Sequence, residues 1–213
     1  AEPPSHDPAE PVRRLSTRAQ AYLVVAAVVG AGLFVQTVRQ QWSGDVWQHA
    51  ASIRAFEAHP LAPNHPLSVG LIDDPYFLNP WALAWGSFSR LTGLGTLTTL
   101  VAAGLVNMVL LGVGLYRLTI RVSASRWAPA LTLLSVLLLW GPLPWRWSGY
   151  PNLNSIGFGL PYPSFLALAL YLFGLTSVLD LTRAAEERRP LSWRHLATLA
   201  ACVVISVLCH PLT

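Results

Sequence analysis

The sequence predicts an all-α, polytopic transmembrane protein. Of its 213 residues, 53% are hydrophobic and only 11% are charged, which is far from the composition of an ordinary soluble domain. Five apolar runs have the character of membrane-spanning helices, and none of them shows the alternating pattern of a β-strand. All 14 basic residues are arginine, and they gather in alternate loops. We therefore expect membrane lipids, and no nucleic acid, among the partners of this chain.

The predicted spans are separated by loops of unequal length. We expect helices over about 21–38, 94–120, 127–140, 161–181 and 195–212. Residues 1–20 are expected to form a proline-rich cytoplasmic leader, and 21–213 the front part of a longer transmembrane domain. The two long loops cover about 39–93 and 141–160. The third span is short for the roughly 20 residues that a bilayer requires.

The distribution of arginine predicts the orientation. Ten arginines flank one side of the predicted spans and four flank the other, although the loops of the second side are longer. By the positive-inside rule the N-terminus is cytoplasmic, the protein is integral to the plasma membrane, and the two long loops face outward. Arg13 and Arg14 before an apolar run also fit a twin-arginine export signal. The run is longer than such signals carry, however, and four more spans follow.

The loop after the first span begins Gly44-Asp45-Val46-Trp47-Gln48-His49. Its pattern predicts a short amphipathic helix on the membrane interface over about 45–58. In such a helix Asp45 and His49 lie four residues apart on one face, where they can share a proton or a metal ion. Asp45 also suits a helix N-cap. A cap and a general base are compatible interpretations of the same residue.

Further acids and histidines fall on the predicted outer side. Asp73 and Asp74 either bind a divalent cation, with Asp45 as a third ligand, or lie in a solvated turn before Pro75. His210 follows the apolar part of the fifth span, where polar side chains usually face a cavity or a partner. These residues lack the spacing of a zinc motif. A divalent cation therefore stays an open alternative, and no other cofactor is expected.

Aromatic residues suggest where a sugar would bind. In the second outer loop, Trp145 and Trp147 flank Arg146, which offers flat apolar faces for a sugar ring and a guanidinium for a phosphate. The alternative is an aromatic belt at the membrane surface. A second amphipathic segment from about residue 79 carries Trp81, Trp85 and Phe88, and we expect its apolar face to anchor in the interface.

Two polar residues lie within the predicted spans. Asn107 is expected to link neighbouring helices by hydrogen bonds. Asp180 lies near Arg183, so a local ion pair explains it without a functional role. The middle of the membrane is otherwise nearly free of ionisable residues.

Together these features resemble the front of a GT-C type membrane glycosyltransferase. The resemblance rests on the cytoplasmic N-terminus, the sequence Gly44-Asp45-Val46-Trp47-Gln48-His49 after the first helix, and the long outer loop with two amphipathic segments. His210-Pro211-Leu212 at an outer helix end adds to it. It covers about the first five spans of such a protein. The arginine-only composition, rich in alanine and tryptophan, is similar to that of actinobacterial proteins, where such enzymes serve cell-envelope biogenesis.

The resemblance implies transfer of a sugar on the outer face, from a polyprenyl-phosphate donor to an envelope glycan, lipid or protein acceptor. Asp45 would be the catalytic base of an inverting reaction, and Arg146 would hold the leaving phosphate. Many members have a second acid directly after the first, whereas this chain has Val46. Whether Asp73 or Asp74 supplies that carboxylate, and whether a metal is used, stays open. We expect the substrates to contact His49, Asp73, Asp74, Trp145, Arg146, Trp147 and His210.

The alternative function is a lipid or glycan transporter or flippase component without transferase activity, and a structural assembly subunit is a third interpretation. A transporter needs ionisable residues along a path near the bilayer midplane. A transferase gathers them at one face. In this sequence the midplane is nearly empty and the outer face is crowded, which favours the transferase.

Overall fold

Helices make up most of the chain that the structure describes. The computed structural model describes residues 17–40, 42, 44–66, 79–140, 151–154 and 156–209. In chain order its helices are α1 (Thr17–Val38), α2 (Val46–Ala58), α3 (Pro80–Thr92), α4 (Thr96–Val122), α5 (Ala128–Leu138), α6 (Ile156–Gly159), α7 (Pro163–Glu186) and α8 (Trp193–Cys209). These ranges contain no β-strand, so the predicted all-α, polytopic fold class is confirmed.

Each of the five predicted spans contains an apolar helix. α1, α4 and α7 have 22, 27 and 24 residues and are long and apolar enough to cross a membrane. α5 and α8 are apolar too, but have 11 and 17 residues. At a rise of 1.5 Å per residue they extend only about 16 and 26 Å. Within the described ranges the chain is therefore a helical membrane protein with three full-length candidate spans.

Large apolar side chains are exposed along the outside of these helices. Val24 and Val28 on α1, Val109 on α4, Leu131 on α5 and Val207 on α8 are each more than half exposed. A soluble protein rarely leaves so large an apolar surface uncovered. Lipid tails would cover such a surface, as the composition predicts.

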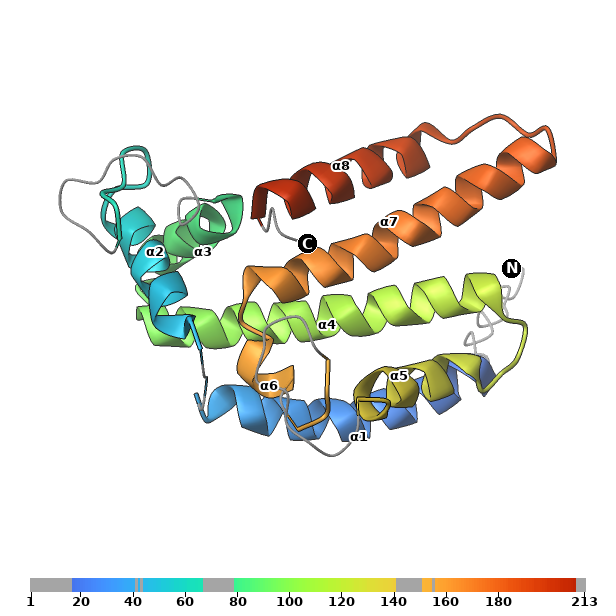
Figure 1. The fold of residues 1–213 in the computed structure, drawn as a ribbon, viewed down its shortest axis with the longest axis horizontal. Helices are drawn as coiled ribbons and strands as arrows, with labels where there is room; N and C mark the ends of the chain where they lie inside the picture. Colours follow the sequence, from blue (N-terminus) through green and yellow to red (C-terminus); the bar gives the residue numbers. More distant parts are fainter. Residues whose placement is uncertain are drawn as a thin grey trace, which may run out of the picture.

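The spans form a layered bundle (Figure 1). α4 lies between the pair α1 and α5 and the hairpin of α7 and α8. α2 and α3 pack on each other beside the start of α4, at the end of the bundle where α1 finishes and α7 begins. The first long loop therefore places both of its helices at one end of the membrane domain.

Small residues allow the spans to approach closely. A Cβ added at Gly104 of α4 would lie 2.8 Å from the Thr37 side chain of α1. One added at Gly114 would lie 3.0 Å from Leu172 of α7. Close contacts at glycine are typical of helix packing in membranes. Two glycines of α4 thus bring its neighbours on either side within contact distance.

α3 follows its sequence signals at both ends. The Asn79 side chain accepts a hydrogen bond from the Ala82 amide at 2.9 Å, and Pro80 occupies the first turn, as is usual at a helix start. Gly93 ends the helix with a φ of 70°. Trp81, however, is only 2% exposed, so the expectation of an interface anchor is wrong for this residue, whereas Phe88 of the same segment is 36% exposed. α2 and α4 cover this face of α3, and the indole packs between helices instead of against lipid.

The arginines separate between the two ends of the bundle, as the loop pattern predicts. Among the described residues, three lie at the end that carries α2 and α3, namely Arg39, Arg54 and Arg90. Eight lie toward the opposite end, namely Arg18, Arg117, Arg121, Arg126, Arg183, Arg188, Arg189 and Arg194. We call the first the α2–α3 end and the second the arginine-rich end.

Candidate functional site

The α2–α3 end contains the predicted acid directly where the chain leaves α1. Gly44 adopts a φ of 83° and turns the chain into α2, a conformation that glycine reaches without steric cost. Asp45 follows at the N-cap position of α2, but its side chain makes no capping hydrogen bond. The position of the predicted cap is thus confirmed, while the capping interaction itself is not made.

The Asp45 carboxylate is paired with a histidine of its own helix. Asp45 Oδ2 lies 3.5 Å from His49 Nε2, within ion-pair range and long for a hydrogen bond. The side chain of Asp45 is 44% exposed, whereas that of His49 is only 10% exposed. The prediction that both residues share one helical face is confirmed. An accessible carboxylate is therefore held beside an imidazole that the protein encloses.

Two aromatic rings from other elements enclose His49. Its ring lies 5.5 Å from the Trp81 ring of α3, edge to face, and 5.0 Å from the ring of Tyr162, which precedes α7. Aromatic contacts at these separations favour a fixed ring orientation. Val46 and Cys209 complete the same apolar cluster. Residues of α3 and the start of α7 thus enclose the histidine of α2, and the end of α8 packs in the cluster that contains their rings.

Tyr162 places a neutral hydroxyl close to the carboxylate. Burial raises the pKa of the Tyr162 phenol above its ordinary value, and the negative charge of Asp45 raises it further. Its hydroxyl oxygen lies 3.8 Å from the position of a Cβ on Gly44, beside the turn that carries Asp45. At neutral pH the phenol keeps its proton, so Tyr162 serves as a hydrogen-bond donor and not as a base.

The raised pKa of Tyr162 predicts a specific loss of stability in alkali. As the pH rises past the ordinary tyrosine value of 10, the unfolded chain releases this proton while the folded chain retains it. The free energy of unfolding therefore falls. Tyr162→Phe removes that contribution. We expect the stability of wild type in detergent to fall more steeply above pH 10 than that of the variant; parallel curves would contradict the assignment.

A buried asparagine fixes the segment that carries Tyr162. Asn107 of α4 is 1% exposed and donates from Nδ2 to the carbonyls of Leu160 and Tyr162, at 2.7 and 3.2 Å. These carbonyls lie in the turn before α7, where the backbone has left the helical pattern. The predicted role of Asn107 as an interhelical link is confirmed. It holds the start of α7, and with it Tyr162, against α4.

The other predicted site residues lie outside the described ranges. They are Asp73, Asp74, Trp145, Arg146, Trp147 and His210. Cys209, the residue before His210, packs in the cluster that contains Val46 and Trp81. The described residues include no group of three histidine, cysteine or acidic side chains placed to hold a metal. A cation held by Asp45 with Asp73 and Asp74 accordingly stays a prediction.

No family model matches the sequence, and neither a curated protein nor a solved structure matches it. The site must be interpreted from its own geometry. The site consists of the exposed carboxylate of Asp45 next to the end of the first span, with the enclosed imidazole of His49 and the neutral phenol of Tyr162 beside it.

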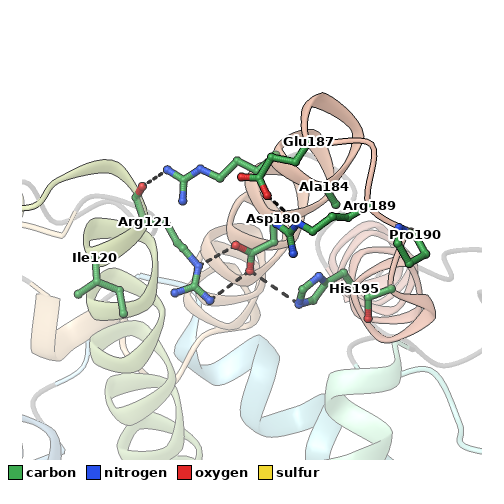
Figure 2. Close-up of a pocket in the computed structure, with 10 residues that line it drawn as sticks. Ile120, Arg121, Asp180, Ala184, Glu187, Arg189, Pro190 and His195 are labelled. Carbon is green, nitrogen blue, oxygen red and sulfur yellow. Dashed lines mark hydrogen bonds and ion pairs between the residues drawn. The ribbon is translucent and has the colours of Figure 1, made fainter.

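A second polar centre, which the sequence analysis did not identify as a site, occupies the arginine-rich end (Figure 2). Asp180 of α7 accepts hydrogen bonds from Arg121 Nε and Nη2 of α4, at 2.7 and 3.3 Å. His195 Nε2 of α8 lies 3.7 Å from Asp180 Oδ2, the oxygen that also accepts from Arg121 Nη2. Asp180 therefore links three helices.

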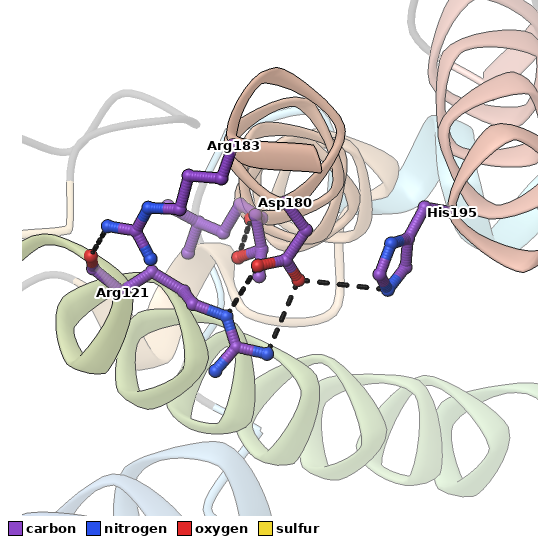
Figure 3. Close-up of polar contacts among 6 residues, drawn as sticks. Arg121, Asp180, Arg183 and His195 are labelled. Atoms are coloured by element: carbon purple, nitrogen blue, oxygen red, sulfur yellow. Dashed lines mark hydrogen bonds and ion pairs between the residues drawn. The ribbon is translucent and has the colours of Figure 1, made fainter. Parts of the chain in front are cut away.

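Asp180 forms its ion pair with Arg121 and not, as predicted, with Arg183. Arg183 donates from Nη2 to the backbone carbonyl of Arg121 (Figure 3). The last carbonyls of a helix lack intrahelical donors and attract cations, and α4 ends at Val122 beside Arg183. One signal pointed to the true partner: Arg121 and Asp180 both lie near the ends of spans that finish on the same side.

Proposed function

We propose that the chain belongs to an integral-membrane glycosyltransferase of the GT-C type in the plasma membrane. Its N-terminus would be cytoplasmic and the α2–α3 end would face outward. The observation that carries the proposal is the Asp45–His49 pair. The half-exposed carboxylate of Asp45 lies shortly after the first span and makes no capping hydrogen bond, and it is in ion-pair contact with the enclosed His49. This arrangement suits a base that must meet a substrate at the membrane surface.

In the proposed reaction Asp45 accepts the proton of an acceptor hydroxyl. The hydroxyl oxygen then forms a bond to the anomeric carbon of the sugar, and the bond from that carbon to the phosphate oxygen breaks. The polyprenyl phosphate leaves with the electron pair, and the anomeric configuration inverts. His49 would orient the carboxylate, and the neutral Tyr162 would donate a hydrogen bond nearby. Asp73, Asp74, Trp145, Arg146, Trp147 and His210 stay predicted substrate contacts.

The placement of charge supports a transferase over a transporter or flippase. In the described parts of the five apolar helices, the ionisable groups other than tyrosine and cysteine lie toward the arginine-rich end, namely Arg18, Arg117, Arg121, Asp180, Arg183, Glu186, Arg194 and His195. A proton or ion path would require such groups at mid-membrane depth. The carboxylate proposed to act, Asp45, lies at the other end.

The function is tested by separating transfer from transport. Full-length protein in sealed proteoliposomes receives a panel of labelled polyprenyl-phosphate monosaccharides and an envelope-glycan acceptor on one side. A transferase releases polyprenyl phosphate and moves the label into the acceptor, with inverted configuration by NMR. A flippase moves the intact donor across the bilayer and leaves its phosphate bond unbroken. Transport without release of polyprenyl phosphate would overturn the proposal.

The orientation is tested by labelling single cysteines. Cys202 and Cys209 are first replaced by alanine, and a cysteine is introduced by Arg54→Cys or Arg188→Cys, one at each end of the bundle. We expect a membrane-impermeant thiol reagent to label the Arg54→Cys variant in intact cells. The Arg188→Cys variant should react only after permeabilisation. The opposite result would place Asp45 in the cytoplasm and remove the proposed site.

A further inference from the structure

A polar cavity of about 450 Å³ opens at the arginine-rich end. It lies between the last turns of α4 and α7 and the start of α8 (Figure 2). α4 and α7 are full-length candidate spans, so their terminal turns lie at the depth of lipid head groups. The cavity is therefore placed where it can meet the polar part of a lipid.

The lining of this cavity carries more positive than negative charge. It contains three guanidinium groups and two carboxylates, a net charge of +1 when His195 is counted as neutral. The charged residues are Arg121, Arg183, Arg189, Asp180 and Glu187. The whole arginine-rich end has eight described arginines and three described acids, Asp180, Glu186 and Glu187, so its net charge is +5. Such an excess attracts anions from the membrane surface.

The charges differ in how firmly they are held. Asp180 is 13% exposed and its bidentate contact fixes Arg121. Arg189 pairs through Nε with Glu187 at 2.6 Å, and both of these side chains are more than half exposed. Exposed pairs of this kind contribute little free energy, so a ligand anion displaces Glu187 at small cost. Arg189 is therefore the cation of the cavity that an incoming phosphate can recruit most easily. Arg183 lines the same cavity and donates from Nη2 to the Arg121 carbonyl.

An apolar surface adjoins the polar cavity. α8 begins with the exposed Trp193, and Leu196, one residue after the cavity-lining His195, is exposed as well. Further along the same helix, Val203 and Val207 are also exposed. A free phosphate would use only the cavity, whereas a phosphate with hydrocarbon tails would use the cavity and this face together.

We propose that this cavity binds the phosphate head group of an anionic phospholipid, whose tails lie along the exposed face of α8. Arg183 and Arg189 contact the phosphate, and the Arg121–Asp180–His195 cluster forms the floor of the site. The site lies at the opposite end of the bundle from Asp45 and does not depend on the transferase proposal.

The test compares two neighbouring arginines. The full-length protein is purified with a mixture of phosphatidylglycerol and phosphatidylcholine, and the lipids it retains are counted by native mass spectrometry. We expect wild type to retain phosphatidylglycerol preferentially, and Arg189→Gln to lower that preference about tenfold, the effect of losing one hydrogen bond between charged groups. Arg188→Gln removes the same charge from the adjacent position, which does not line the cavity, and should retain the preference.

Three results would overturn the proposal. Equal retention of the two lipids by wild type would exclude anion selectivity. An equal loss in Arg188→Gln and Arg189→Gln would show that overall charge, and not the cavity, attracts the lipid. Displacement of phosphatidylglycerol by millimolar inorganic phosphate would assign the cavity to a soluble anion. A thermal melt of each variant confirms folding, which we expect because the Arg189 side chain is exposed.

Discussion

Asp45→Asn is expected to reduce sugar transfer by about 100- to 10,000-fold, the usual contribution of a general base. The amide has nearly the shape of the carboxylate but cannot accept the acceptor proton at neutral pH. The protein should still fold, because the Asp45 side chain is half exposed and makes no capping hydrogen bond. The measurement is the initial rate of label transfer from a polyprenyl-phosphate sugar by the full-length protein, at saturating donor.

Glu57→Gln provides the matched control for this prediction. Glu57 lies on the same helix, at the same end of the bundle, and its carboxylate contacts Thr96 Oγ1 at 3.4 Å instead of His49. This change removes one negative charge from the same region, as Asp45→Asn does, but it leaves Asp45 in place. It should therefore leave the transfer rate nearly unchanged. A second measurement separates chemistry from structure: formate added to Asp45→Ala should restore part of the rate by supplying a carboxylate. Undiminished transfer by Asp45→Asn would remove this residue from the mechanism.

Local rules explain why the core of this site could be predicted from sequence. Asp45 and His49 lie four residues apart, and a helix places such residues on one face whatever surrounds it. The start of α3 at Asn79-Pro80 and its end at Gly93 follow from capping chemistry that involves only neighbouring residues. The spans could be predicted because their composition reflects the solvent around them.

Tertiary packing determines what the sequence analysis missed. Tyr162 reaches His49 only because α7 begins beside α2, and no local pattern encodes that proximity. Tryptophan is typical of membrane interfaces, yet other helices cover Trp81. The partner of Asp180 lies 59 residues earlier in the chain, on α4. Periodicity indicates which face of a helix is apolar, but not whether a lipid or another helix covers that face.

The contact between α2 and α3 predicts the second large effect, a loss of stability in Gly86→Ala. A Cβ on Gly86 would lie 2.5 Å from Phe56 Cβ, 2.7 Å from the Ile53 carbonyl oxygen and 3.0 Å from the Glu57 amide nitrogen. Two of these three atoms belong to the backbone, so no change of rotamer relieves the overlap. The two helices must move apart. Overpacking of this kind costs about 1–3 kcal/mol in the free energy of unfolding.

This separation would also reach the candidate site, because Phe56 and Trp81 belong to the cluster that contains Val46 and Tyr162. We therefore expect Gly86→Ala to lower both the unfolding free energy in detergent and the transfer rate. Gly32→Ala is the control: it also adds one methyl group to a helix, and its Cβ would meet nothing within 4 Å. It should leave both quantities unchanged or slightly raise stability. If the two variants melt alike, α2 and α3 do not pack as closely as this contact requires, and Trp81 would no longer be held against His49.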